Sequence, residues 1–513
     1  MKNVVILGAG TGGSIVAARL ARRLPQGWHV TLVDRDDAHV YQPGLLFLPF
    51  GKTDPASLVR PRRPLAPPGV TLRIEPVERV EPVHHRIIFG DGEVLGYDVL
   101  VVATGSRILP GRVEGLAGEG WHDTAFDFYT LEGATALAQK LDRLESGRLV
   151  VHVAELPIKC PVAPLEFAFL ADAFLQERGR REAVDIVYAT PLDGAFTKPR
   201  ASAVLGGMMD ARRIKVETDF VVESVDGGRR AMRSFDGREL DYDVLVTVPP
   251  HGGAELVTAS EMGDESGWLP TDRHTLRSRD WPSVFALGDC TDVPTSKAGA
   301  VAHYQSEVLV ANVLAFIADR PPVEASDGHA TCFVETGHGK AMLIDFNYDT
   351  EPLPGVFPYA GVGPFTLLGE SSTNHWGKVA FEWLYWNVLL RGTDIPLPHR
   401  MSMAGKESAP PPAPPRAAVP AHRGPSRLER IRAARAGKVA GAAPEPAAEL
   451  SPAQQRVIDA ARAEFQSRGV SPNIRRLTVV ARVSTRELYD LFPRAPARTV
   501  AQLAGIPRPV GCL

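Results

Sequence analysis

The chain has 513 residues, of which 44% are hydrophobic, so it can bury several cores and is long enough for about three domains. The formal net charge of −3 hides an asymmetry, because the residues from 422 onward carry 16 Lys and Arg against 7 Asp and Glu, which leaves −12 on the rest. Four Cys exclude a disulfide-stabilised scaffold, and the start of the chain shows no signal peptide or apolar span, so we expect a cytoplasmic protein.

The first recognisable element is an apolar strand followed at once by a glycine-rich turn, VVILGAGTGG. Gly8, Gly10 and Gly13 fit G-x-G-x-x-G, in which the glycines allow a tight turn, close approach of a pyrophosphate and packing of the next helix on the strand. A second strand, 29–33, ends in Asp34, which is spaced to bind the adenosine ribose hydroxyls. This combination predicts a dinucleotide-binding site.

Strand and helix patterns alternate from the N-terminus to about residue 320, as in doubly wound parallel sheets. Further strands are expected at 98–105, 148–153, 185–189, 243–248 and 284–289. This layout resembles the disulfide reductase fold with two dinucleotide-binding domains, in which an ATG segment and a GD segment return the chain to the first domain. The resemblance implies FAD, bound near Thr104, Gly105, Gly288 and Asp289.

The predicted fold class is therefore α/β, with two dinucleotide-binding-type domains and a small all-α module at the C-terminal end. The predicted parts are an FAD-binding domain (1–110 and 280–330), a second Rossmann-like domain (111–279), a region of antiparallel strands and one helix (331–406), a linker rich in Pro and Ala (407–448) and a helical module (449–513). The linker composition favours partial polyproline II structure.

The turn of the second Rossmann-like domain reads AELPIKCPVAPLE and contains no glycine that would admit a pyrophosphate. A nicotinamide cofactor is therefore not expected. The turn instead carries Cys160, next to Lys159 and just before a helix expected to begin near Pro164. A helix N-terminus and an adjacent lysine would both lower the pKa of the thiol, so we expect a reactive thiolate.

Three segments resemble the sulfide:quinone oxidoreductases and the flavoprotein subunit of flavocytochrome c sulfide dehydrogenase. They are IKCPVAPLEFAF, GDCTDVPTSKAGAVAHYQ and TCFVETGHGKAMLIDFNYDTEPLPG. The resemblance covers about 1–406 and implies that Cys160 and Cys332 form a redox pair beside the flavin. Sulfide would attack the pair, leave a persulfide on one sulfur, and send electrons to the flavin through the other.

The same resemblance implies roles for three more residues. Lys297 would lie near the flavin pyrimidine, Glu166 would move protons at the sulfide site, and Pro43 would belong to a loop that packs on the flavin. Each has an ordinary structural reading as well: a loop lysine, a glutamate in a first helical turn and a common turn proline. Cys290 does not match a redox cysteine of the family and is interpreted as a core thiol.

Two departures from the membrane-bound quinone reductases concern the electron acceptor. Many of them have a third Cys in the segment that reads HDTAF here (122–126) and a His in the segment that reads FTK here (196–198). This chain lacks both and is therefore more similar to the flavocytochrome subunit than to those quinone reductases. The acceptor is accordingly either a quinone or a cytochrome. The aromatic helix expected around 378–390 is too short to span a bilayer and suits either peripheral membrane attachment or a buried core or dimer helix.

The C-terminal module resembles the sulfur-relay proteins of the DsrC/TusE type through RGVSPNIRRLT, STRELYDLFPRAPA and the ending AGIPRPVGCL. The resemblance implies that Cys512, the penultimate residue, accepts sulfur as a persulfide on a mobile arm. The second arm Cys of the dissimilatory members would fall at Ala501. The pattern around 484–492 also fits a helix-turn-helix, although a module of this size usually needs a dimer to bind DNA specifically.

We therefore expect an FAD-dependent enzyme that oxidises sulfide or a small persulfide, reduces a quinone or a cytochrome and passes the sulfur to Cys512 and then to a downstream acceptor protein. A homodimer and a peripheral contact with the inner face of the cytoplasmic membrane are also expected; a metal site and nucleic-acid binding are not. The alternatives are a redox-responsive flavoprotein regulator with a helix-turn-helix DNA-binding module and an ordinary flavin NADH dehydrogenase.

Overall fold

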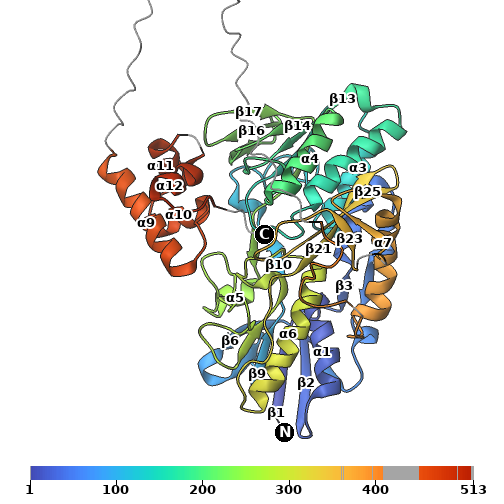
Figure 1. The fold of residues 1–513 in the computed structure, drawn as a ribbon, viewed down its shortest axis with the longest axis vertical. Helices are drawn as coiled ribbons and strands as arrows, with labels where there is room; N and C mark the ends of the chain where they lie inside the picture. The colour runs from blue at the N-terminus through green and yellow to red at the C-terminus, as the bar shows by residue number, and fades with distance from the viewer. Residues whose placement is uncertain are drawn as a thin grey trace, which may run out of the picture. The chain divides into compact units, whose positions relative to one another are not determined.

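The computed structural model describes residues 2–359, 361, 363–395, 397–407, 450–493 and 495–509. These residues fall into two compact units, one that ends at 407 and one that begins at 450 (Figure 1). The predicted polyproline II linker and Cys512 lie outside the described residues.

The first unit starts with a five-stranded sheet in the order β20-β9-β1-β2-β5, all parallel. The strands are β1 (Lys2–Leu7), β2 (Trp28–Asp34), β5 (Val70–Ile74), β9 (Val99–Val102) and β20 (Val284–Ala286). As predicted, the segments that carry the ATG and GD motifs return to this sheet, where β9 lies beside β1 and β20 lies beside β9. Helices α1 (Thr11–Arg23) and α6 (Gly299–Ile317) pack together on one face, where Val16 and Leu309 share a buried cluster with Ile6.

Helix α6 is long and apolar enough to cross a membrane by length and composition, but 67% of its most apolar window is buried inside the protein. We therefore interpret it as a core helix. Smaller antiparallel sheets decorate this domain: β3 (Ala38–Val40) with β4 (Val59–Pro61), and β6 (Val77–Glu81) with β7 (Arg86–Phe89) and β8 (Val94–Gly96).

The second domain repeats the design with a parallel sheet in the order β11-β18-β12-β13-β14. Its strands are β11 (Ala125–Phe126), β12 (Gly147–Val153), β13 (Val184–Ala189), β14 (Lys215–Glu217) and β18 (Val244–Val248). Its helices are α2 (Leu131–Asp142), α3 (Ala163–Glu177) and α4 (Pro199–Ala211). Antiparallel strands β15 (Val222–Asp226), β16 (Ala231–Ser234) and β17 (Glu239–Asp241) extend it. Strand β10 (Ser106–Ile108) pairs with β19 (His251–Gly253), next to the short helix α5 (Glu255–Ala259).

The third region of the first unit is a mostly antiparallel sheet covered by one helix. Its strands are β21 (Ala330–Gly337), β22 (Lys340–Phe346), β23 (Gly355–Phe357), β24 (Phe365–Leu367) and β25 (Glu370–Ser371). Helix α7 (Ser372–Leu384) follows and continues into a π-helical turn, Tyr385–Leu389. The sequence predicted this helix from 378 onward; it begins earlier because Ser371 caps it by accepting the backbone N–H of Asn374.

The second unit is a small helical module, as predicted, of α9 (Pro452–Arg468), α10 (Ile474–Ala481), α11 (Thr485–Leu491) and α12 (Pro496–Ala504). A capping box between Ser451 and Gln454 starts α9. The core includes Val457, Leu477 and Leu488. Ala501, where the dissimilatory relatives would carry a second Cys, is buried on α12.

Candidate active site

The turn after β1 has the shape that a dinucleotide requires. A Cβ on Gly8 would lie 2.4 Å from the carbonyl oxygen of Ala103, and a Cβ on Gly13 would lie 1.8 Å from that of Gly8, so both positions need glycine. A Cβ on Gly10, in contrast, would meet nothing within 4 Å. Gly10 therefore faces open space at the start of α1, where backbone N–H groups can hold a pyrophosphate.

Buried polar atoms around this turn suit a flavin dinucleotide. The carboxylate of Asp34 accepts the backbone N–H of Ala9 at 2.6 Å, which fixes it at the end of β2 for a ribose. Among the described residues, the hydroxyl of Thr104 and the side-chain nitrogen of Gln305 are buried without a hydrogen-bond partner. The side-chain oxygen of Gln305 accepts the N–H of Gly288 at 2.7 Å. The residues present thus fit FAD, with unpaired donors where a polar ligand would bind.

Lys297 connects this loop to the turn that carries Cys160. Its ammonium donates to the carbonyl oxygens of Asp289 at 3.0 Å and Thr291 at 2.7 Å and lies 4.1 Å from the ring centroid of Trp268. Its backbone carbonyl accepts the N–H of Cys160 at 2.7 Å. Gly105 and Gly288 both have φ near +70°, at 66° and 72°, so the ATG and GD turns use the conformation that glycine allows. The predicted cofactor residues therefore meet at one edge of the first sheet.

The loop around Pro43 lies beside the same turn. Pro43 itself is exposed in a short 3₁₀ turn, and its neighbour Gln42 accepts a hydrogen bond from the ammonium of Lys159 at 3.2 Å. Cys290, in contrast, is fully buried, and its thiol donates to the carbonyl oxygens of Val102 and Leu287. Burial raises its pKa to about 11, which agrees with the interpretation of Cys290 as a core thiol.

Cys160 and Cys332 come from two segments of the first unit that are far apart in the sequence. Cys160 ends a glycine-free turn with φ 44° and precedes α3, while Cys332 lies in the middle of β21, opposite Ile344 of β22. Helix α3 packs on β21 and brings the two segments together. Both residues are free thiols in this structure, and no disulfide joins the cysteines of the described residues. They belong to the same hydrophobic cluster.

The electrostatics of the two thiols differ from the expectation drawn from the sequence. Burial raises the pKa of Cys160 well above its ordinary value, and the charges of Glu166 and Cys332 raise it further. The backbone N–H of Ala163 at the start of α3 does lower it, but by less. The expectation of a depressed pKa was therefore wrong, because it neglected desolvation, and because the ammonium of Lys159 points to Gln42 instead of the thiol.

The cation that does act on the thiols is Lys378 of α7. It lowers the pKa of Cys160 and that of Cys332, whose pKa burial nevertheless raises to about 12. Lys378 forms an ion pair with Glu166, whose side chain is 1% exposed. The same oxygen of Glu166 accepts the backbone N–H of Glu335 at 2.7 Å, so the carboxylate ties α3 to β21. No local pattern in the sequence points to Lys378, because it lies 212 positions from Glu166.

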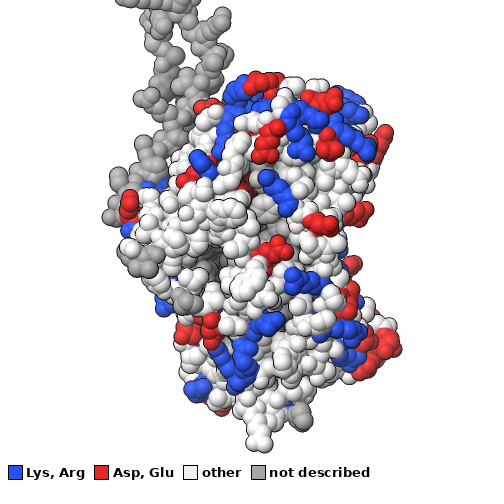
Figure 2. Space-filling view, turned by 90° about the vertical axis from the view of Figure 1, so that its right-hand side faces the viewer, with Lys and Arg blue, Asp and Glu red and all other residues white. Residues whose placement is uncertain are grey.

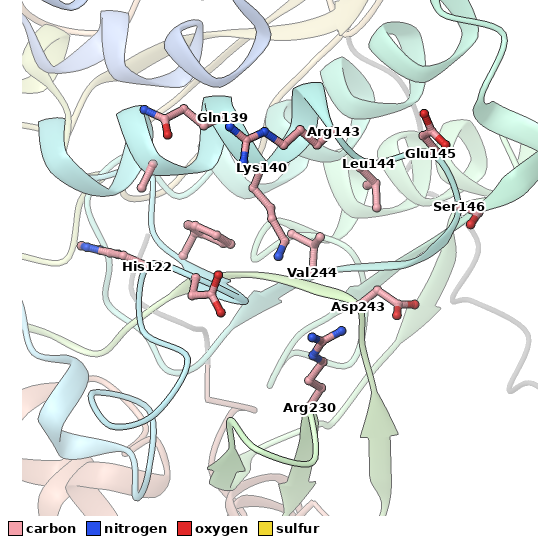
Figure 3. Close-up of a pocket in the computed structure, with 13 residues that line it drawn as sticks. His122, Gln139, Lys140, Arg143, Leu144, Glu145, Ser146, Arg230, Asp243 and Val244 are labelled. Carbon is pink, nitrogen blue, oxygen red and sulfur yellow. The ribbon is translucent and has the colours of Figure 1, made fainter.

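The two segments that depart from the quinone reductase pattern lie in different surroundings. Lys198 is buried, 5.2 Å from the ring centroid of Phe346 on β22, and burial lowers its pKa. His122 instead lines a hollow of about 470 Å³ between α2 and the start of β18, where Lys140 and Arg230 extend into the same space (Figure 3). None of the predicted site residues lines this hollow, so it is separate from the candidate active site.

The outer side of α7 carries an exposed apolar strip. The side chains of Trp376, Val379 and Trp383 are 66%, 46% and 66% exposed. Of the aromatic residues that the sequence marked on this helix, Tyr385 and Trp386 are buried. On the face of the molecule where α7 lies, charged side chains are most crowded toward the top and toward the bottom, with fewer between them (Figure 2). The first part of the helix thus exposes apolar side chains, and the part that follows it is buried.

Comparisons with known proteins agree with this geometry. Residues 2–306 match the family model described as pyridine nucleotide-disulphide oxidoreductase, and residues 433–513 match the model of DsrC like protein. The mitochondrial sulfide:quinone oxidoreductase of Mus musculus is 26% identical over 396 residues, 76% of this chain and 86% of that protein. The sulfide:quinone oxidoreductase structure from Aquifex aeolicus superposes with a TM-score of 0.65 at 21% identity and covers 77% of this chain and 92% of that one.

The module has relatives of its own. The gamma subunit of dissimilatory-type sulfite reductase from Nitratidesulfovibrio vulgaris is 32% identical over 69 residues, 14% of this chain and 66% of that subunit. FAD is the cofactor of this family, and the buried polar atoms around the glycine turn fit it. The chain belongs to the pyridine nucleotide-disulphide oxidoreductase family and is a flavin-dependent oxidoreductase with a DsrC-like domain.

Proposed function

We propose that this enzyme oxidises sulfide, or a small persulfide, at Cys160 and Cys332, passes the electrons to a quinone or a cytochrome and hands the sulfur to Cys512. The observation that carries the proposal is the meeting of the two cysteine segments at the edge of the FAD site, beside the buried Glu166–Lys378 ion pair. The named relatives act on sulfide and quinone, which supports the same substrates here.

The chemistry starts from the oxidised pair. HS⁻ attacks one sulfur of a Cys160–Cys332 disulfide, so that the S–S bond breaks, a persulfide forms on one cysteine and a thiolate is released on the other. The thiolate of Cys512 then attacks the outer sulfur of the persulfide and carries it away, which frees the second thiolate. The two thiolates re-form the disulfide by giving up two electrons. FAD, held at the glycine turn near Gly10 and Asp34, would supply the two-electron acceptor for that oxidation.

Lys378 has a defined part in this sequence. The thiols lie in a buried site where burial disfavours the thiolate, and Lys378 is a cation there that lowers the pKa of both. It therefore stabilises the leaving thiolate when HS⁻ attacks. Glu166 holds Lys378 in place and can accept the proton of the incoming sulfur species.

Sulfur transfer within one chain is supported by the way the first unit ends. The ammonium of Lys406 contacts the carboxylate of Asp345 at 2.6 Å, and both side chains are at most 2% exposed. Asp345 pairs across the sheet with Thr331, the neighbour of Cys332, and also accepts a hydrogen bond from the hydroxyl of Thr331 at 2.6 Å. The segment that leads to the module is thus anchored beside the strand that carries Cys332.

The chain segment between the two units is long. Glu407 and Leu450 are separated by 42 residues, which can span at most roughly 150 Å. A tether of this length can hold a carrier thiol at a high effective concentration near its own enzyme site, provided that the geometry permits contact. Delivery to Cys512 without release of free polysulfide follows from this proposal.

The acceptor side of the proposal concerns α7. Trp376, Val379 and Trp383 form an exposed apolar strip of the kind that inserts into a membrane interface. We assign this strip to a peripheral contact with the inner face of the cytoplasmic membrane, where a quinone is available. A homodimer interface is the competing use of the same strip. Vesicle flotation of the wild type and of Trp376→Ser/Trp383→Ser separates the two uses. If the strip contacts the membrane, the variant stops floating with the vesicles and its oligomeric state stays the same.

A single-turnover experiment tests sulfur transfer. The purified yellow protein is mixed anaerobically with one equivalent of sulfide and then analysed by peptide mass spectrometry. The proposal predicts a one-sulfur adduct on Cys512, and its absence in Cys160→Ser and Cys332→Ser. A wild-type protein that turns over with sulfide and a quinone yet never carries sulfur on Cys512 would contradict the hand-off while leaving the oxidation intact.

A further inference from the structure

Two more charged side chains continue the buried ion pair toward the surface. Glu335 follows Cys332 by three residues on β21, and its side chain is 1% exposed. Both of its carboxylate oxygens contact Nδ1 of His375 on α7, at 3.0 and 3.1 Å. The side chain of His375 is 22% exposed, so the ring lies between the buried carboxylate and solvent.

Four charged groups are connected by direct contacts, by one backbone hydrogen bond and by their charges. Glu166 contacts Lys378, the backbone N–H of Glu335 donates to Glu166, and Glu335 contacts His375. The charges of Glu166 and Glu335 both act on Lys378, which connects the inner carboxylate to the outer one. Burying two carboxylates in one place costs free energy, and one lysine alone does not compensate for both.

The proposed reaction releases a proton at this site. Sulfide that enters as H₂S gives one proton to Glu166 and attacks the disulfide as HS⁻, so that proton has to reach solvent before the next turnover. Burial raises the pKa of Glu335 above its ordinary value, although Lys378 and His375 lower it. A carboxyl group whose pKa is raised by burial takes up a proton more readily than an exposed one.

We propose that Glu335 and His375 form the outward half of a proton path that starts at the Cys160/Cys332 pair and passes Glu166 and Lys378. Glu335 receives the proton from the inner pair, and His375 exchanges it with solvent. This inference rests on the proposed sulfide oxidation and adds two residues to it. Its geometry is the chain of contacts from α3 to β21 and from β21 to α7.

Chemical rescue tests the path, because a merely structural histidine would not respond to it. FAD-loaded His375→Ala is mixed anaerobically with saturating sulfide, and flavin bleaching is followed by stopped flow with and without imidazole. We expect the rate to fall about tenfold and imidazole to restore several-fold of it, since a free base can replace one missing proton carrier. Glu335→Gln should lose a similar factor without recovery in imidazole.

The matched control is His84→Ala, which removes an exposed histidine on the surface of the first domain. It should bleach at the wild-type rate and ignore imidazole. Two results would overturn the path: a wild-type rate in His375→Ala, or a slow rate that imidazole leaves unchanged while the FAD content and melting temperature stay normal. Failure of sulfide to bleach the wild-type flavin would instead refute the proposed function.

Discussion

Removing the charge of Lys378 should destabilise the protein through Glu166. In Lys378→Met the carboxylate of Glu166, 1% exposed, loses its ion-pair partner and, among the described residues, keeps the hydrogen bond from the backbone N–H of Glu335. Breaking one partner out of a buried pair costs about 3–5 kcal/mol, because an uncompensated charge stays in the core. A unit of roughly 400 residues has an unfolding entropy near 0.8 kcal/mol per kelvin, so the melting temperature should fall by about 4–6 °C.

Differential scanning calorimetry of the FAD-loaded protein measures this effect. Lys378→Met/Glu166→Gln removes both charges and should recover most of the loss, because neither partner is left unpaired. Lys340→Met changes an exposed lysine on β22 and should shift the melting temperature by less than about 1 °C. Two results would contradict this expectation: a melting temperature of Lys378→Met equal to that of the wild type, or a melting temperature of the double variant below that of Lys378→Met.

Three further predictions concern other parts of the first unit. Gly13→Ala should lose FAD and much of the fold, since its Cβ would collide with backbone, whereas Gly10→Ala should fold and lose only FAD affinity; flavin absorbance and circular dichroism distinguish these outcomes. Glu155→Gln should stabilise the protein at pH 8, by up to about 3 kcal/mol, but not at pH 4.5. Burial raises the pKa of Glu155 from 4.5 to about 7, so the wild-type fold loses stability as the pH rises through that range; urea unfolding at both pH values tests this, and an equal gain at both would refute it. Lys406→Met should leave sulfide-driven flavin bleaching unchanged and slow the appearance of sulfur on Cys512, which quenched mass spectrometry measures. Equal rates of sulfur transfer in Lys406→Met and the wild type would show that the Lys406–Asp345 ion pair does not serve as an anchor.

The fold was accessible from the sequence because its signals are local. The glycine spacing around Gly8 and the apolar strands that lead to Thr104 and Gly288 determine which strands enter the first sheet, and β9 and β20 join that sheet as predicted. Periodicity also identified the antiparallel region and the helical module. It placed the start of α7 too late, because the Ser371 cap is a contact and not an apolar pattern.

The site was only partly accessible. The two cysteine motifs indicated Cys160 and Cys332, but the partners that set their charge come from helices far along the chain. Lys378 and His375 reach β21 through tertiary packing that no spacing rule reports. The effect of desolvation on Cys160 was also missed, since burial depends on what covers the turn and not on its own residues.

Anaerobic sulfide titration of the flavin tests the central claim most directly, namely that Cys160 and Cys332 together take electrons from sulfide. The wild-type flavin should bleach at about one equivalent of sulfide and stay oxidised with NADH, and neither Cys160→Ser nor Cys332→Ser should bleach at a comparable rate. Full bleaching of either variant by sulfide, or bleaching of the wild type by NADH alone, would contradict the account.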